Sequence, residues 1–208
     1  MNSFFPTNPN YTLEQFIASY SKRLVKALET LDTEQIKKVF EALATNIQSE
    51  AIIYTCGNGG SSAIAEHLVC DFVKGASTDS TVEPKVVPLL STPIITAIAN
   101  DISYDEVFAY QVKKYGSEND ILLSVSSSGN SENIIRAIET AKSMSMLTIS
   151  FVGFDGGRAK EISDFVLHVR ADNYGICEDA HHALMHIFAQ FIRLSFINDS
   201  NKIGSLKF

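Results

Sequence analysis

Side chains in two helix-forming stretches have the types and spacing needed for acid–base or metal chemistry. His67 and Asp71 are four residues apart, which places both on one face of a helix. Glu178, His182 and His186 repeat that step later in the chain. Imidazoles with carboxylates suit Zn²⁺ or a similar divalent ion, and they suit aldose–ketose isomerisation, which needs a base and an acid. Each side chain taken singly also fits a structural role.

Two loops rich in glycine and serine have the composition of phosphate-binding turns. Residues 57–62 (GNGGSS) and 126–131 (SSSGNS) each follow an apolar run and precede a helix-compatible stretch. Small residues let backbone N–H groups point at an anion, and a helix N-terminus adds partial positive charge. Neither loop has the lysine of a P-loop or the GxGxxG spacing of a dinucleotide site. Either loop alone also fits a capped turn between a strand and a helix.

Five short apolar runs predict buried strands that alternate with helices. The runs are 51–56, 85–90, 120–126, 146–152 and 164–169, and the stretches between them are 60–74, 104–115, 131–145 and 157–163. This order predicts an α/β fold, a three-layer sandwich around a five-stranded parallel sheet. Because ligands bind at the carboxyl ends of such strands, both loops should open into one crevice.

An N-terminal helical hairpin is predicted at about 12–47. Apolar residues recur there at helical spacing and are interrupted at Leu31 and Asp32. We expect a single domain over 1–208, in which the hairpin precedes an α/β core at about 51–198. A polar tail at 199–208 should be loosely held.

The last predicted helix, about 177–198, is apolar around most of its circumference. Its polar residues form one stripe, namely His182, His186, Gln190 and Arg193. A chain of this size can hardly bury the remaining apolar surface by itself. We therefore expect a homo-oligomer, either a tetramer or at least a dimer.

The composition limits the partners and the location that we expect. The 208 residues carry a formal net charge of -7, which argues against a nucleic-acid-binding surface. No apolar run approaches the roughly 20 residues that span a bilayer, and the N-terminus has no signal-like leader. We expect a cytoplasmic protein whose Cys56, Cys70 and Cys177 are reduced.

Together these motifs resemble the sugar isomerase (SIS) family, whose fold is flavodoxin-like, and within it the phosphoheptose isomerases. The similar segments are 57–63, His67, 96–101, 104–112, 126–131, 154–157 and the final Glu178, His181 and His186. They cover nearly the whole chain in order. The resemblance implies an enzyme that interconverts sedoheptulose 7-phosphate and D-glycero-D-manno-heptose 7-phosphate, in heptose biosynthesis for lipopolysaccharide, capsule or S-layer glycans.

The same resemblance implies which residues form the site. Around the sugar phosphate it places Asn58, Gly59, Gly60, Ser61, Asn100, Asp101, Ser126, Ser127, Ser128, Ser131 and Glu178. His67 and His186 fall on zinc-ligand positions of the family, and with Asp71 and Glu178 we expect them to hold one divalent ion, best matched by Zn²⁺. The catalytic groups would be Asp71 or Glu178 as the base, with His186 assisting proton transfer. Family members commonly form homotetramers with active sites between subunits.

Two residues depart from the family pattern. Asp71 stands where the best-known members have a Glu that acts as base and metal ligand, and Glu178 stands where Gln is usual. The shorter Asp71 reaches less far, while Glu178 adds negative charge near the expected ion. The pair would hold a metal more tightly, or it marks a branch that acts on a different phosphosugar.

Two alternatives use the same fold without catalysis. A regulator that binds the replication initiator DnaA as a tetramer resembles the isomerases but has lost the carboxylate and the final histidine of their site. This chain keeps a carboxylate at Asp71 and the imidazole of His186, which favours an enzyme. A sugar-phosphate-sensing domain is disfavoured because no DNA-binding helices are attached.

Overall fold

A computed structural model gives the fold and describes residues 9–203. The helices are α1 (Leu13–Glu29), α2 (Thr33–Gln48), α3 (Gly60–Cys70), α4 (Thr92–Asp101), α5 (Ala109–Tyr115), α6 (Glu132–Ser143), α7 (Gly157–Ile162) and α8 (Tyr174–Ser195). The strands are β1 (Ile52–Gly57), β2 (Lys85–Pro88), β3 (Ile121–Ser126), β4 (Leu147–Val152) and β5 (Phe165–His168). Among the residues described, no helix combines the length and apolar character needed to cross a membrane.

The five strands form one parallel sheet in the order β2-β1-β3-β4-β5. All five predicted strands are confirmed, with ends that shift by only one or two residues. In the β1–β3 register, Gly57 pairs with Val125, so both strands end at nearly the same level. The loops at 57–62 and 126–131 therefore leave the sheet side by side, at its carboxyl edge.

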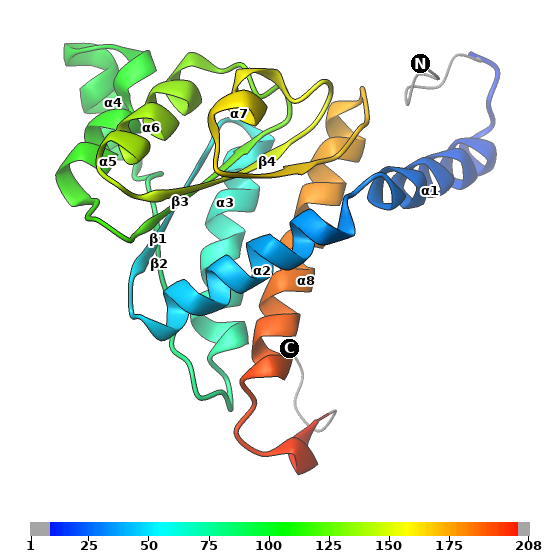
Figure 1. Ribbon diagram of the computed structural model, residues 1–208. Helices are drawn as coiled ribbons and strands as arrows, with labels where there is room; N and C mark the ends of the chain where they lie inside the picture. Colours follow the sequence, from blue (N-terminus) through cyan, green and yellow to red (C-terminus); the bar gives the residue numbers. More distant parts are fainter. Residues whose placement is uncertain (1–8, 204–208) are drawn as a thin grey trace.

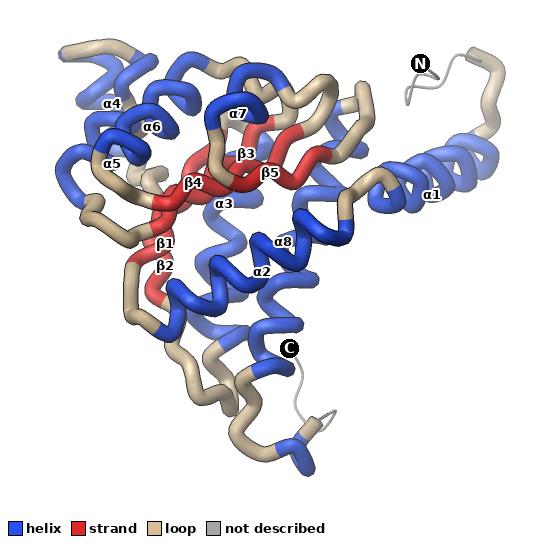
Figure 2. The backbone as a smooth tube through the Cα atoms, viewed as in Figure 1, coloured by secondary structure: helices blue, strands red, loops and turns tan. Residues whose placement is uncertain are grey.

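Helices cover both faces of the sheet, which confirms the three-layer sandwich (Figures 1 and 2). Side chains alternate along each strand, so Ile53 and Leu123 face one core while Tyr54 and Leu122 face the other. Helices α2, α3 and α8 bury apolar residues in the first core, and α4 to α7 do so in the second. Figures 1 and 2 show α3 and α8 side by side on the same face.

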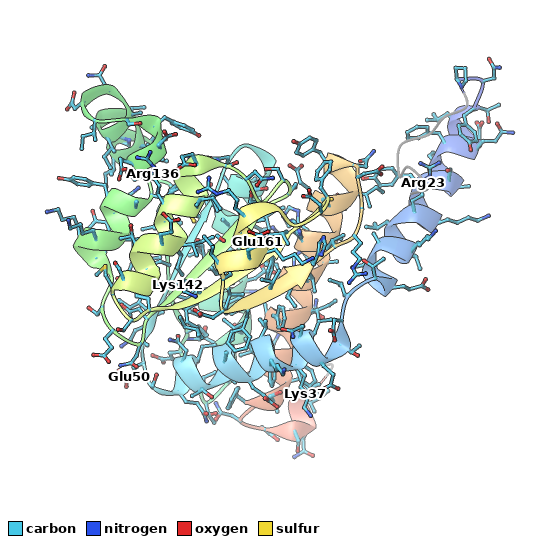
Figure 3. The ribbon with its side chains drawn as sticks, turned by 45° about the horizontal axis from the view of Figure 1, so that its top comes forward. Arg23, Lys37, Glu50, Arg136, Lys142 and Glu161 are labelled. Carbon is cyan, nitrogen blue, oxygen red and sulfur yellow. The ribbon has the colours of Figure 1, made fainter. Side chains whose placement is uncertain are left out.

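Two N-terminal helices form as predicted, but they do not fold back on each other as a hairpin. Asp32 caps α2 by accepting hydrogen bonds from the backbone N–H groups of Glu34 and Gln35. Helix α1 leads into α2 in roughly the same direction and stands away from the sheet, as Arg23 in Figure 3 illustrates. Its packing partner is α8 instead, where the Tyr20 hydroxyl donates to Asp179 at 2.6 Å.

Other helical stretches differ in detail from the sequence prediction. The predicted helix 60–74 is divided into α3 and a π-helical turn, Asp71–Ala76, and 104–115 is divided into a 3-10 turn, Tyr104–Glu106, and α5. Helix α4 was not predicted, because a proline in its first turn and an apolar run resemble a loop followed by a strand. The predicted tail includes a 3-10 turn, Ser200–Lys202, and its last residues, 204–208, lie outside the described part of the chain.

Candidate active site

A cluster of two imidazoles and one carboxylate forms where α3 meets α8. The carboxylate Oδ2 of Asp71 accepts a hydrogen bond from His186 Nδ1 at 2.6 Å, and its Oδ1 lies 3.4 Å from His67 Nε2. One potential ligand atom from each of the three residues lies within 4.8 Å of the others. The cluster can therefore hold a divalent cation or pass a proton between its members.

The π-helical turn after α3 explains the position of Asp71. This residue begins the turn, directly after Cys70, and is only 8% exposed. Wide turns of this type frequently occur at functional sites. The 3.6-residue periodicity seen in the sequence places His67 and Asp71 on one face, but it does not show the wider turn that follows.

His182 lies beside this cluster, one turn before His186 on α8. Its Nε2 lies 3.4 Å from His67 Nδ1, and its ring stacks on that of His186 with centroids 6.1 Å apart. Burial, followed by the neighbouring His67 and His186, lowers the pKa of His182, so the ring is neutral near pH 7. His182 was part of the polar stripe recognised in the sequence, but no role was assigned to it.

A small polar pocket of about 120 Å³ lies at the carboxyl ends of β1 and β3, near the N-terminal end of α8. Its lining residues are Asn58, Ser61, Val125, Ser126, Ser127, Ser128, Ser131, Tyr174 and Glu178. A larger groove of about 1290 Å³ lies at the opposite edge of the sheet, where carboxylates such as Glu41 and Glu118 outnumber the single Lys38, whereas Glu178 is the one carboxylate among the hydroxyls and amide of the small pocket. The small pocket is therefore the better anion site.

The serine loop gives this pocket its donors. Gly129 has a left-handed φ of 64°, and its N–H bonds back to Ser126 at 3.1 Å, which closes the loop tightly. The hydroxyl of Ser127 is buried and has no hydrogen-bond partner among the described residues. A buried hydroxyl without a partner in the protein is costly, so that of Ser127 is available to hydrogen-bond a ligand in the pocket. The N-terminus of α6 adds a favourable field for an anion.

Asn58, on the other loop, is held by a network that the sequence analysis missed. Its side-chain amide forms two reciprocal hydrogen bonds with Asn133, each of 2.9 Å, and its Oδ1 also accepts from the Tyr104 hydroxyl at 2.9 Å. These bonds occupy Oδ1 and leave one N–H of Asn58 for a ligand. The only sign of this network in the sequence is that Asn133 follows closely after the serine loop, in the first turn of α6.

An ion-pair network fastens the turn that carries Tyr104 to helix α6. Arg136, labelled in Figure 3, donates to Glu106 at 2.5 Å and to Glu132 at 3.1 Å. Asn100 and Asp101 lie at the exposed end of α4, bonded to each other at 2.8 Å, and do not line the pocket. Their predicted role in binding the sugar phosphate stays a prediction.

Glu178 lies in the pocket rather than in the cluster of His67, Asp71 and His186. Eight residues separate it from His186, which is about 12 Å along the helix axis. Its carboxylate contacts Gly60 so closely that a Cβ there would collide with both oxygens. Burial, with a smaller contribution from Asp179, raises the pKa of Glu178. Its place as the fourth metal ligand stays a prediction.

This raised pKa predicts a pH-dependent gain in stability for Glu178→Gln. A carboxyl whose pKa is raised by folding stabilises the folded state only while it is protonated, and this contribution is lost as the pH rises through the folded pKa. We expect little effect below about pH 4, near the usual glutamate pKa of about 4.3, and an increase in the free energy of unfolding at pH 7. Urea unfolding at both pH values measures it, with the exposed Glu139→Gln as control. An equal gain at both pH values would contradict it.

Comparisons with known proteins agree with this geometry. Residues 15–153 match the SIS domain. A phosphoheptose isomerase of Helicobacter pylori (strain ATCC 700392 / 26695) is 37% identical over 196 residues, which cover 90% of this chain and 96% of that protein. The solved structure of a phosphoheptose isomerase from Francisella tularensis matches with a TM-score of 0.81 and 28% identity, over 88% of this chain and 100% of that one.

A second solved structure, a phosphoheptose isomerase from Neisseria gonorrhoeae, has a TM-score of 0.80 and 30% identity, over 87% of this chain and 98% of that one. The similarity in sequence thus extends over both loops, the α3–α8 cluster and the pocket. The chain therefore belongs to the SIS-domain family, in its phosphoheptose isomerase branch, and is an isomerase.

Proposed function

We propose that this isomerase converts sedoheptulose 7-phosphate into D-glycero-D-manno-heptose 7-phosphate in the cytoplasm, for the biosynthesis of heptose-containing glycans. One observation carries the phosphate part of the proposal: the buried Ser127 hydroxyl has no partner among the described residues and lines a pocket of hydroxyl donors. The names of the relatives support the heptose part.

The serine loop would bind the phosphate and leave the carbonyl end of the sugar near the carboxylates. Ser126, Ser127, Ser128 and Ser131 line one side of the pocket, and Glu178 lines the same pocket from α8. A free N–H of Asn58 would donate to a sugar or phosphate oxygen, because Asn133 and Tyr104 hold its amide in one orientation. This arrangement fixes the substrate before any proton moves.

Isomerisation of a ketose moves one proton between carbons and one between oxygens. Asp71 or Glu178 would remove the proton from C1 and return it to C2, while His186 would deliver a proton to the oxygen on C2 and accept one from the oxygen on C1. The raised pKa of Glu178 brings it closer to the working pH of a base. The 2.6 Å bond between Asp71 and His186 orients that imidazole.

Donors in the cluster also suit a divalent ion, most simply Zn²⁺. Two imidazoles and a carboxylate are a common zinc ligand set, and the three ligand atoms lie within 4.8 Å of one another. Small side-chain movements would bring them to bonds of about 2.0–2.2 Å. A bound Zn²⁺ would act as a Lewis acid on the substrate oxygens. His67, Asp71 and His186 would hold it. Glu178, predicted as a fourth ligand, lies about 12 Å along α8 from His186 and would need a larger rearrangement to reach the same ion.

The direct test incubates the pure protein with sedoheptulose 7-phosphate and follows the aldose product. Turnover supports the proposal. Turnover of another ketose phosphate alone would support the isomerase activity but reject sedoheptulose 7-phosphate as the substrate. Inertness towards all phosphosugars, with binding of a protein such as DnaA, would favour the non-catalytic alternative.

The phosphate site predicts a weaker Michaelis complex in Ser127→Ala and Ser128→Ala. Each hydroxyl removed from a charged phosphate should cost about 1.5–3 kcal/mol, which raises KM roughly 10-fold or more and changes kcat less. Steady-state kinetics measures this. The exposed Ser143→Ala, at the other end of α6, is the matched control. Unchanged KM values in both loop variants would show that these serines only shape the turn.

We also propose that the protein is a homotetramer whose active sites lie between subunits. Ile187, Phe191 and Leu194 follow one face of α8 and are 49–50% exposed, and Leu13 and Ile17 are more exposed still on α1. Surfaces of this kind are normally buried in an interface. Helix α1 already contacts α8 near Glu178 through Tyr20, so a partner covering α1 would lie close to the pocket.

A charge on the apolar face of α8 should disrupt this assembly. In Phe191→Asp we expect smaller species, because a carboxylate would be buried without a partner in the interface. Light scattering should give about four times 22.8 kDa for the native protein. Tyr115→Asp, an exposed aromatic on α5 at the other face of the sheet, should keep the native mass. A mass of one chain for the native protein would contradict the prediction.

A further inference from the structure

The geometry points to His182 as a positioning residue that accepts a hydrogen bond from His67 Nδ1 and thereby leaves His67 Nε2 unprotonated for the metal ion. This inference rests on the proposed metal site. It concerns a residue outside the predicted ligand set, on the same face of α8 as His186. Three features support it: the two His67 nitrogens face different groups, the His67 ring is partly exposed, and the rings of His182 and His186 stack on each other.

The two ring nitrogens of His67 face different partners. Nε2 lies 3.4 Å from Asp71 Oδ1, on the side of the cluster that groups His67, Asp71 and His186. Nδ1 lies 3.4 Å from His182 Nε2, on the opposite side of the ring. A neutral imidazole carries its proton on one nitrogen only. If Nε2 is to bind an ion, the proton must be on Nδ1, and among the described residues His182 is the group in hydrogen-bonding distance of it.

Packing alone does not hold the His67 ring. Its side chain is 44% exposed, so the ring can turn, and water would compete for both of its nitrogens. The aromatic contacts show what restrains it. His67 meets His182 edge-on, with centroids 5.4 Å apart and planes at 69°, and it meets His186 in the same way at 5.2 Å and 84°.

Helix α8 accounts for this arrangement. His182 and His186 are one turn apart, and their rings stack nearly parallel at 14°, so both present an edge towards α3. Nδ1 of His186 hydrogen-bonds to Asp71, and Nε2 of His182 faces Nδ1 of His67. Residues that orient a metal-binding imidazole through its second nitrogen commonly change metal affinity about 10- to 100-fold when replaced.

Three variants on α8 separate this role from a general effect on the helix. His182→Leu removes the acceptor, and we expect Zn²⁺ to bind about 10- to 100-fold more weakly in competition with a chromophoric chelator. His182→Gln places an amide oxygen near the former Nε2 and should recover part of the affinity. Gln190→Leu, which removes a polar side chain one turn beyond His186 on the same stripe, should bind Zn²⁺ as the native protein does.

The tautomer of His67 gives a second measurement that does not depend on activity. Long-range ¹H–¹⁵N spectra of the zinc-loaded protein should show His67 protonated on Nδ1. In the metal-free protein the Asp71 carboxylate competes for a proton on Nε2, and His182→Leu should shift the tautomer further towards Nε2. Equal zinc affinity in His182→Leu, or an unchanged His67 tautomer in the metal-free variant, would overturn the inference while leaving the isomerase proposal intact. A native protein that binds no divalent ion would overturn it together with the proposed metal site. The isomerase assay would decide the proposed reaction separately.

Discussion

We expect Asp71→Asn to lower turnover by about 10²- to 10⁴-fold, the range attributed to a positioned acid–base group. The carboxylate contacts both imidazoles of the cluster, His186 at 2.6 Å and His67 at 3.4 Å, and is 8% exposed. The amide has nearly the same shape but no negative charge and one acceptor oxygen instead of two. Steady-state kinetics and metal analysis of the purified variant measure the loss.

Asp71→Glu is the matched control, because it keeps the charge and introduces the residue that the family resemblance implies at this position. We expect it to keep far more activity than Asp71→Asn, with any deficit due to the longer side chain. Circular dichroism should show native helix content in both variants. Native turnover in Asp71→Asn would remove Asp71 from the mechanism and leave Glu178 as the base.

The largest effect on stability is expected for Gly129→Ala in the serine loop. Its φ of 64° is strained for any residue with a Cβ, and a Cβ there would collide with the backbone carbonyl of Gly156. That carbonyl cannot move freely, since the next turn is tied to the loop by the bond from Ala159 N–H to Gly129 O, 2.9 Å long. Strain at one such position costs about 1–3 kcal/mol, and the collision adds to it.

Gly59→Ala separates the two causes. Gly59 has a similar φ of 56°, but nothing lies within 4 Å of the position of its Cβ, so the substitution adds strain without a collision. Urea unfolding should therefore give a clearly larger loss in the free energy of unfolding for Gly129→Ala than for Gly59→Ala. The first variant should also raise KM, because the displaced loop carries Ser127 and Ser128. Equal losses in the two variants would show that the loop moves away from the Gly156 carbonyl without a cost in free energy.

Local patterns in the sequence accounted for the five strands, for most of the helices but not α4, and for part of the site. The strands are short runs rich in apolar residues, largely buried in β1, β3 and β4 and less so in the edge strands β2 and β5, and their pattern is visible within six or seven positions, so all five were located. The serine loop was predicted as a phosphate site from its composition and its position after a strand, and it does line the pocket. His67, Asp71 and His186 were predicted from residue type, helical spacing and the family resemblance. Their grouping at the junction of α3 and α8 is confirmed.

Contacts between distant segments could not be obtained in the same way. The bond from His186 to Asp71 and the approach of His182 to His67 each join residues 115 positions apart. Both depend on how α3 and α8 cross, which packing against the sheet decides and periodicity does not. The pairing of Asn58 with Asn133 likewise depends on β1 and β3 lying next to each other.

The amino-acid sequence by itself determined the order and type of the main elements, the two loops at the strand ends and the identity of the polar groups, because hydrophobic periodicity and turn chemistry are local properties. Only the tertiary structure decided that α1 and α2 do not form a hairpin and that Glu178 lies in the pocket lined by the serine loop. It also decided that Asp71 begins a π-helical turn. These features arise from packing between segments that are far apart in the chain. The free energy of such packing depends on the side chains of both segments together.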